Sequence, residues 1–522
     1  MATQKIVRMN LGQLVVAGLV SFLTLGLSTS CGGDDTEEGA CSTKDNKGCS
    51  GGQVCREGKD GRAACFCSPD TREGCPEGLE CANTPNGDPG CYCSLENDTG
   101  CDAAKVCEEV PGATPTCFPP VTLGGQVFDL ATKAAIADAH VVARDANFAA
   151  ASGVAITDPM GHYTLEVPTK RKPDGTLLTN QITLRADAAG YVTFPTAPRL
   201  ALPIEVSQAM GSPPHLESSA TDVGMLALES SAGLGTVTGK VLAKRPAGTL
   251  IVAGGAIKAG GGASGVSDID GTYTVFNVPA GSITVRGYKQ GLQLDKATAT
   301  VTAGATAEGV DLKEIGAAIA VVSGNVEIVN PGKGKDTSVI LVVDETFIPN
   351  AARGEAPPGL RAYPVSGAFQ FTDVPDGNYV VLAAFENDFL VRDPDTSIGG
   401  TDIVHIVVSG KDVPVSQSFK VTGALDVVSP DKEAVVSGVP KFVWGDDSGE
   451  NHYEVRVYDA FGTKVWEKTD VPGVSGSMTV TVDYGGPALK SGMLYQFRAT
   501  SIKQGGAPIA ITEDLRGVFL YK

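Results

Sequence analysis

Aromatic and basic side chains are scarce in this chain of 522 residues. Phe, Trp and Tyr make up 6% of it, and 41 lysines and arginines face 60 aspartates and glutamates, so the formal net charge is −19. A surface this acidic repels the phosphate backbone of nucleic acids and the headgroups of an anionic membrane. We therefore expect no nucleic-acid partner and no electrostatic attachment to a bilayer.

Long apolar runs are missing as well. Beyond the first thirty residues, no segment has the roughly 18 continuous apolar residues that a membrane-spanning helix needs. Cysteine is absent after Cys117, although thirteen cysteines occur up to that point. Glycine (65) and proline (31) are abundant, which favours turns, short strands and small-residue cores. These counts predict several domains of about 100 residues each, built mainly from β-strands.

The first thirty residues have the pattern of an export signal, with a basic start and an apolar segment over residues 11–27. Their ending, Leu27-Ser28-Thr29-Ser30-Cys31, resembles the lipobox of bacterial lipoproteins, although Ser28 stands where that family usually has leucine. The resemblance implies a lipoprotein signal peptide over residues 1–30 and a lipid on Cys31 that anchors the chain in a membrane. An ordinary signal peptide cleaved nearby is the alternative.

The other twelve cysteines form a tandem repeat with a period of 26 residues and the spacing C-x7-C-x5-C-x9-C, over residues 41–118. They are Cys41, Cys49, Cys55 and Cys65, then Cys67, Cys75, Cys81 and Cys91, then Cys93, Cys101, Cys107 and Cys117. Zinc sites favour close C-x2-C pairs, which are missing here, and exported thiols meet an oxidising compartment. We therefore predict disulfides. Acylation of Cys31 would remove the odd thiol and leave residues 31–40 as an acidic tether.

Sequence alone allows three pairings in each unit. The spacing and the C-x-C junctions at Cys65/Cys67 and Cys91/Cys93 resemble the first four cysteines of epidermal-growth-factor-like modules. That resemblance implies first-to-third and second-to-fourth pairing. A unit this small cannot bury a self-sufficient core, so two bridges at roughly 3 kcal/mol each are expected to supply much of its stability. The acidic calcium motif of some such modules is absent, so we predict no calcium there.

Three segments after residue 121 share a second pattern. Each opens on Gly-x-Val, at Gly125, Gly239 and Gly324, and continues to a Gly-x-Tyr or Gly-x-Phe turn. The second and third then close on Val-Pro-x-Gly, whereas the first carries a polar insertion over residues 169–179. Tight turns that feed period-two strands are typical of antiparallel β-structure.

This series resembles the carboxypeptidase regulatory-like family of transthyretin-like β-sandwiches. The resemblance implies non-catalytic accessory or interaction modules over residues 119–232 and 233–318, and a related sandwich over residues 319–425. The last segment, residues 426–522, resembles a fibronectin type III sandwich. There Trp444 is expected in the core, and Leu489 with Tyr495 in the tyrosine-corner strand. The predicted fold class is therefore all-β, with tandem sandwiches after a disulfide-rich region.

No set of residues stands out for chemistry. The five histidines are scattered, and no G-x-S-x-G elbow or phosphate-binding loop occurs; Gly260 to Gly262 and Gly332 to Lys335 are interpreted as exposed loops or turns. Asp268-Ile269-Asp270-Gly271 supplies too few of the six or so oxygens that calcium needs, so we prefer a hairpin turn, and calcium stays the alternative. Trp444 and Trp466 are both expected near a core, which disfavours a sugar-binding platform. We predict no catalytic residue, no cofactor, no metal site and no enzymatic activity.

The predicted architecture is a string of units that forms a stalk, with the lipid anchor at one end. We expect a non-enzymatic, lipid-anchored protein of the outer membrane or cell surface of a bacterium. It would bind a protein or polysaccharide ligand through strand edges or loops, in adhesion, binding or scaffolding. The alternatives are an accessory subunit of a secreted peptidase or glycan-active system, or a glycan-binding protein.

Overall fold

A computed structural model describes residues 41–522 apart from 70, 72, 84–86, 96–98, 103, 197–198, 255–262, 329–336, 350–352, 384–389, 393–402 and 507. The predicted signal peptide, Cys31, the tether and the two predicted glycine loops lie outside the described residues. The described chain consists of strands with two single-turn 3-10 helices, η1 (Val206–Gln208) and η2 (Asp344–Thr346). The predicted all-β fold class is confirmed. Nowhere in the described ranges is there a helix long and apolar enough to cross a membrane.

Each cysteine repeat folds as a small hairpin closed by two disulfides. The hairpins are β1 (Val54–Glu57) with β2 (Ala63–Phe66), β3 (Leu79–Asn83) with β4 (Pro89–Cys93), and β5 (Val106–Glu108) with β6 (Thr116–Phe118). The bridges are Cys41–Cys55, Cys49–Cys65, Cys67–Cys81, Cys75–Cys91, Cys93–Cys107 and Cys101–Cys117. This is the pairing that the growth-factor-like resemblance implies.

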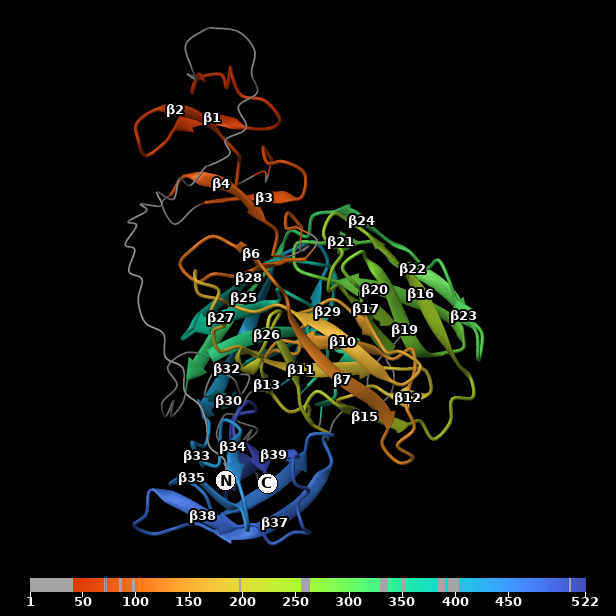
Figure 1. Cartoon of the computed structure of the whole chain (residues 1–522), viewed down its shortest axis with the longest axis vertical. Helices are drawn as coiled ribbons and strands as arrows, with labels where there is room; N and C mark the ends of the chain where they lie inside the picture. The colour runs from red at the N-terminus through yellow and green to blue at the C-terminus, as the bar shows by residue number, and fades with distance from the viewer. Residues whose placement is uncertain are drawn as a thin grey trace, which may run out of the picture.

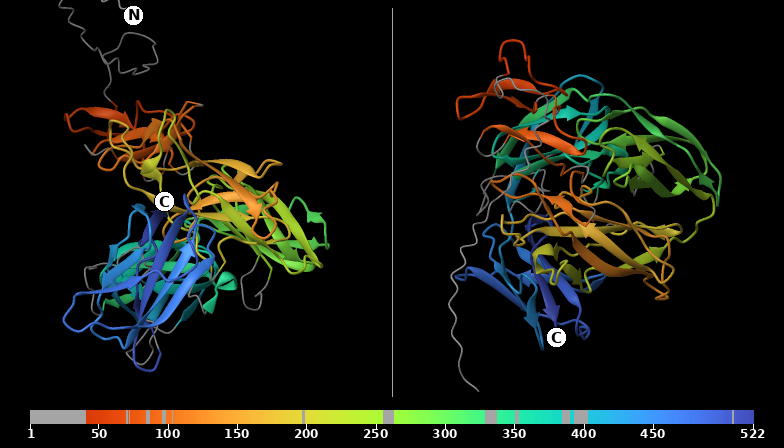
Figure 2. Two further views of the ribbon diagram at one scale, coloured as in Figure 1. Left: turned by 60° about the horizontal axis from the view of Figure 1, so that its bottom comes forward. Right: turned by 45° about the horizontal axis from the view of Figure 1, so that its top comes forward.

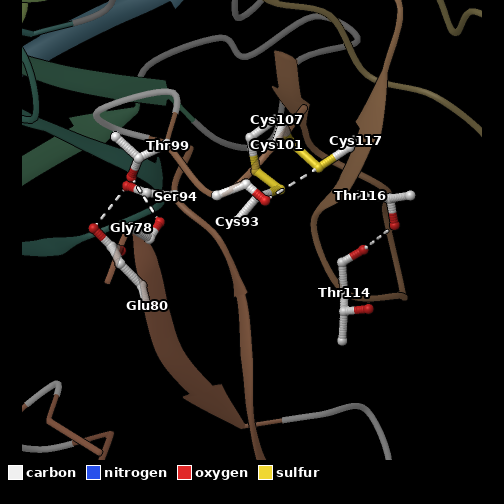
Figure 3. Close-up of a disulfide and its surroundings, with 11 residues drawn as sticks. Gly78, Glu80, Cys93, Ser94, Thr99, Cys101, Cys107, Thr114, Thr116 and Cys117 are labelled. Carbon is white, nitrogen blue, oxygen red and sulfur yellow. Dashed lines mark hydrogen bonds between the residues drawn. A yellow bond between two sulfur atoms is a disulfide. The ribbon is translucent and has the colours of Figure 1, made fainter. Parts of the chain in front are cut away.

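The repeats follow one another along the longest axis of the molecule: the first two project beyond the sandwiches, and the third lies beside them (Figure 1). Figure 3 shows how the second and third repeats are joined: Thr99 Oγ1 donates to Gly78 O at 2.8 Å, and Ser94 Oγ donates to Glu80 Oε1 at 2.7 Å. Polar contacts across the junction therefore help to join these repeats.

The first sandwich has the sheets β10-β7-β15-β12, with β14 beside β7, and β13-β11-β8-β9. Its strands are β7 (Val121–Asp129), β8 (His140–Arg144), β9 (Ala155–Ile156), β10 (His162–Val167), β11 (Gln181–Asp187), β12 (Tyr191–Val192), β13 (Ile204–Glu205), β14 (His215–Glu217) and β15 (Val223–Ala227).

The second sandwich has the sheets β19-β16-β24-β21, with β23 beside β16, and β18-β17-β20-β22. Its strands are β16 (Leu234–Leu242), β17 (Leu250–Ala253), β18 (Ala263–Val266), β19 (Thr272–Pro279), β20 (Gly281–Tyr288), β21 (Gln293–Leu294), β22 (Ala297–Val301), β23 (Thr306–Ala307) and β24 (Leu312–Gly316).

The third sandwich repeats the same strand order in the sheets β28-β25-β32-β30 and β27-β26-β29-β31. Its strands are β25 (Ala320–Ile328), β26 (Thr337–Val343), β27 (Arg361–Val365), β28 (Ala368–Val374), β29 (Gly377–Ala383), β30 (Leu390–Arg392), β31 (Val404–Val408) and β32 (Val413–Gly423). In all three sandwiches the strand that contains Gly-x-Val pairs antiparallel on one side and parallel on the other.

The shared Gly-x-Val and Gly-x-Tyr residues meet in space. Tyr163 Oη donates to Thr221 O at 2.5 Å, and Tyr273 Oη donates to Val310 O in the second sandwich. A Cβ on the facing Gly125 would lie only 2.1 Å from the same Thr221 O. The glycine is therefore required by close packing, which explains why the two motifs occur together.

The fourth sandwich has the sheets β33-β35-β38 and β34-β41-β39-β36-β37, with β40 beside β39. Its strands are β33 (Val427–Ser429), β34 (Ala434–Val436), β35 (Lys441–Gly445), β36 (His452–Asp459), β37 (Lys464–Pro472), β38 (Thr479–Asp483), β39 (Leu494–Ile502), β40 (Pro508–Ile511) and β41 (Val518–Tyr521). Trp444 is fully buried, and Lys490 N donates to Tyr495 Oη at 2.8 Å. The family names of all four sandwiches stay predictions.

The first three sandwiches meet through one repeated joint. Asn277 Oδ1 of the second sandwich accepts from Gly190 N of the first at 2.8 Å. Asp373 O of the third accepts from Gly291 N of the second, also at 2.8 Å. Asn277 and Asp373 both precede Val-Pro and both have positive φ angles. The residue directly before Val-Pro therefore makes the contact at both joints.

The predicted stalk is wrong for the four sandwiches, which form a cluster instead. The fourth sandwich folds back onto the first, where the rings of Phe128 and Phe461 meet edge to face at 5.2 Å. Arg199 of the first sandwich donates to Phe461 O. Figure 2 shows from two further sides that the fourth sandwich lies against the others. Sequence periodicity describes single sandwiches and holds no signal for contacts between distant ones.

Candidate functional site

A cleft of about 790 Å³ lies where the third repeat meets the first three sandwiches. The first sandwich lines it with residues 149–155 and 164–168, and the third repeat with Leu95 and Val106. The second sandwich contributes Arg245, Asp268 and Lys289, among others, and the third contributes Pro358. Its volume is within the range of roughly 300–1,000 Å³ that is usual for binding sites.

The polar insertion of the first sandwich fixes the third repeat as a wall of this cleft. Arg171 from the insertion forms a buried ion pair with Glu108 of β5, and its Nη2 donates to Pro119 O at 2.7 Å. Its guanidinium lies 5.0 Å from the centre of the Phe118 ring. The backbone adds a hydrogen bond from Arg171 N to Glu109 O at 2.9 Å. The repeat is thus joined to the first sandwich by a buried charged contact.

The first two sandwiches also differ in a short segment, which lines the cleft in the first sandwich. The tetrapeptide Ala-Ser-Gly-Val occurs at residues 151–154 of the first sandwich and 263–266 of the second. In the second, it forms β18 and packs tightly against β19, because a Cβ on Gly265 would lie 2.3 Å from Thr274 O. Ser267-Asp268 follows it directly.

In the first sandwich, Ala155 and Ile156 are inserted before the corresponding Thr157-Asp158. The tetrapeptide lies against the second sandwich there, with Val154 N donating to Asp268 Oδ1 at 3.0 Å. A Cβ on Gly153 would lie 2.9 Å from the same carboxylate oxygen. The displaced segment and β10 therefore form facing walls of the cleft.

Charged groups in the cleft are held by backbone partners. Asp145 Oδ1 accepts from Asn147 N at 2.8 Å and from Ala149 N at 3.0 Å. Burial raises the pKa of Asp145, and these two N–H groups oppose that rise. Lys289 Nζ donates to Arg245 O and Ala247 O at 3.1 and 2.7 Å.

A buried ion-pair network joins three sandwiches beside the cleft. Glu355 of the third sandwich accepts from Arg144 at 2.5 Å and lies 2.8 Å from Arg185, both of the first. Arg185 also donates to Asp187 and to Ser264 of the second sandwich. Burial would raise the pKa of Glu355, but the two guanidinium groups hold it below its usual value. Breaking such a pair on one side is costly, so the network fixes how the sandwiches sit.

The loop that carries Glu355 also reaches the fourth sandwich. Arg353 Nη2 lies 2.6 Å from Asp514 Oδ2, and Arg498 pairs with the other oxygen of Asp514. The Arg353 guanidinium also covers the ring of Phe148 from the first sandwich at 5.2 Å. One loop of the third sandwich therefore contacts both the first and the fourth sandwich, a role that sequence reasoning missed.

The two aspartates weighed as a calcium site form a hairpin turn. Asp268 Oδ1 accepts from Val154 N and from Ile269 N. Asp270 Oδ1 accepts from Thr272 N at 2.8 Å, and its Oδ2 lies 3.6 Å from Lys240. In the part of the chain that the structure describes, the metal-like clusters of sulfur, imidazole or carboxylate ligands are three cysteine trios. Those sulfurs are held in disulfides.

The histidines remain far from a common centre, each with its own neighbour. His140 meets the ring of Phe276, and His405 Nδ1 lies 2.9 Å from Asp344. The other three, His162, His215 and His452, lie beside Asp158, Thr122 and Asn451 respectively. Trp466 is half-buried against Phe442 and Tyr484.

Comparisons with known proteins give only distant likenesses, since no protein family and no curated protein matches the chain. A DUF3823 family protein from Bacteroides ovatus is 12% identical, with a TM-score of 0.21 over 39% of this chain and 100% of that one. The major pilin subunit of Bacillus cereus is 11% identical, with a TM-score of 0.13 over 58% and 99%. The extending region of a large adhesion protein is 13% identical, with a TM-score of 0.14 over 77% and 99%. Likenesses this distant assign neither a family nor a function.

Proposed function

We propose that this chain is a non-enzymatic binding protein of a bacterial outer membrane or cell surface, tethered by a lipid on Cys31. The repeats act as a rigid spacer, and the cluster of sandwiches carries the binding surface. The chemistry of the sequence supports export, because its disulfides persist in an oxidising compartment and not in the cytosol.

The observation that carries the proposal is the buried joint between Arg171 and Glu108. A freely hinged linker has no need of a buried ion pair, which is expensive to desolvate and is stable only with good geometry. Here the pair is surrounded by further contacts to Pro119 and Phe118. Such a joint holds the cleft and the repeats in one orientation, as a spacer between a membrane and a binding surface requires.

The test of the tether is made on the full chain, expressed in a bacterium and recovered from the membrane fraction. Intact-mass analysis is expected to show a chain that begins at Cys31, carries acyl groups and contains six disulfides. Cys31→Ser is the matched control and is expected to release the protein from the membrane with its disulfides intact. An unmodified Cys31, or free thiols within residues 41–117, contradicts the proposal.

The test of the binding role uses protease treatment of intact cells and of cells with a permeabilised outer membrane. Cleavage of the sandwich region in intact cells supports exposure on the surface. Cleavage only after permeabilisation places the protein on the periplasmic side and contradicts a surface role. Hydrolase assays on peptides and polysaccharides are expected to show no turnover by the purified chain.

A further inference from the structure

The edge of strand β10 faces the cleft. β10 pairs with β7 on one side and ends its sheet on the other. Residues 164–168 all line the cleft, including the inward-facing Leu165 and Val167 as well as the outward-facing Thr164 and Glu166. Since residues that face opposite sides of the sheet both line the cleft, the backbone edge of β10 meets it.

This edge has unused pairing capacity. Within the described residues, the backbone groups of 164–167 form no hydrogen bond with a backbone other than that of β7. The corresponding edge in the second sandwich, β19, is covered by the tightly packed Gly265 of β18. In the first copy the corresponding strand, β9, consists only of Ala155 and Ile156, and the preceding residues 151–154 lie against the second sandwich instead of extending it. An exposed edge is a template for another strand.

The charge of the cleft indicates which strand would fit. Glu166 is exposed on the outward face of β10, and Asp145 and Asp268 lie in the opposite walls. Lys289 is engaged by two backbone carbonyls, and Asp145 and Asp268 accept from backbone N–H groups, so Glu166 is the exposed acidic group on the strand itself. The whole chain carries a net charge of −19, so its field attracts cations. The small side chains of Ala149, Ala150 and Ala151 leave room beside the strand.

We propose that the cleft binds an extended, basic peptide segment of a partner protein, which adds as a strand to the free edge of β10 and places a lysine or arginine opposite Glu166. This inference rests on the proposed binding function and specifies its ligand. The backbone hydrogen bonds supply affinity, and alternate side chains supply specificity. Residues 164–167 offer an edge of roughly 13 Å.

The probe is a fluorescent, end-capped hexapeptide, Val-Lys-Val-Lys-Val-Thr, titrated into the full-length chain and followed by anisotropy. Two control peptides have the same length: one replaces both lysines with glutamate, and one replaces alternate residues with proline, which cannot pair along a strand. Saturable binding of the lysine peptide alone is expected. Equal binding of the proline peptide overturns strand addition, and equal binding of the glutamate peptide overturns the charge assignment.

Two variants locate the binding. Glu166→Gln is expected to weaken the lysine peptide about two- to fivefold, as the loss of one cross-strand charge pair does. Deletion of Ala155 and Ile156 restores the spacing of the second sandwich and is expected to abolish binding. Its matched control, Ile156→Ala, changes a side chain that is 58% exposed and is expected to bind normally.

Hydrogen exchange of the wild-type chain gives a test that does not depend on how well the deletion variant folds. In the wild-type chain, the lysine peptide is expected to slow exchange of amides within residues 164–167. Binding with no protection there overturns the proposal. A chain that is lipidated and surface-exposed but fails to bind the peptide contradicts this inference alone, whereas a cytosolic, unlipidated chain contradicts the proposed function.

Discussion

In the disulfide repeats, cysteine pairs occupy the place that valine, leucine and aromatic side chains hold in the sandwiches. Among the described residues of 41–118, the buried apolar side chains are those of six cysteines, Pro89 and Val110. Those six form the first-to-third bridge of each unit, while the second-to-fourth bridges are half-buried. The second sandwich instead buries a core of residues such as Val237, Ile251 and Leu312 between two sheets.

The difference follows from size. A unit of about 26 residues cannot remove enough apolar surface from water to offset its chain entropy, so covalent closure must restrict the unfolded state. A sandwich of about 100 residues can bury two sheet faces against each other and needs no bridge. The repeats are therefore sensitive to redox conditions and the sandwiches to packing defects, which separates the two regions experimentally.

Reduction of the disulfides has the largest expected effect. Loss of two bridges at roughly 3 kcal/mol each exceeds what a repeat of this size can retain, so residues 41–118 should unfold. Both tryptophans, Trp444 and Trp466, lie in the fourth sandwich, so tryptophan emission reports on that sandwich alone. We expect reductant to make the repeats susceptible to protease while the tryptophan spectrum stays native. A shift of the spectrum on reduction would show that the two regions are coupled.

The joint between the regions is tested by Arg171→Ala. Removing the cation from beside buried Glu108 is expected to cost about 3–5 kcal/mol, as for one-sided loss of a buried ion pair. Hydrogen exchange of the Arg171 amide, which bonds to Glu109 O, measures the opening of the joint. Lys170→Ala removes the neighbouring exposed pair with Glu109 and should cost less than about 1 kcal/mol. Similar effects of the two changes would contradict a buried joint.

The packing of the sandwiches is tested on one strand. Leu312 of β24 is fully buried, whereas Ile315 three residues later is 64% exposed. Leu312→Ala is expected to cost about 2–5 kcal/mol in the free energy of unfolding, because it removes contacts and leaves a cavity. Ile315→Ala should stay within about 0.5 kcal/mol in the same calorimetric measurement. Neither change should alter the protease resistance of the oxidised repeats.

A further effect depends on pH. Because the folded-state pKa of Glu355 is lowered, its ionised form stabilises the fold at pH values above the unfolded pKa of about 4.3. That contribution is lost as the pH falls through the lower folded-state pKa. Unfolding free energies of the wild type and Glu355→Gln are therefore expected to differ at neutral pH and to approach each other as the pH falls from about 4.3 through the lower folded-state pKa. A constant difference between pH 2.5 and pH 7 would contradict this role.

The covalent part of the molecule could be predicted from the sequence because the cysteine register is a local signal. Twelve cysteines in one spacing indicate disulfides, although the pairing within each unit came from a family resemblance. The β class and the turn motifs were equally local, since glycine, proline and alternating apolar residues act on their own neighbours. The lipid on Cys31 stays a prediction.

The tertiary structure alone decided where the site lies. The insertion at residues 169–179 and the extra pair Ala155-Ile156 are visible in the sequence as length differences, but their partners, Glu108 and Asp268, belong to other units. The same holds for Glu355, which meets Arg144 across 211 positions of the chain. Periodicity reports which face of a strand is buried and carries no information on which distant surface covers it. That choice depends on the packing of whole sandwiches, and it turned the expected stalk into a cluster with a cleft.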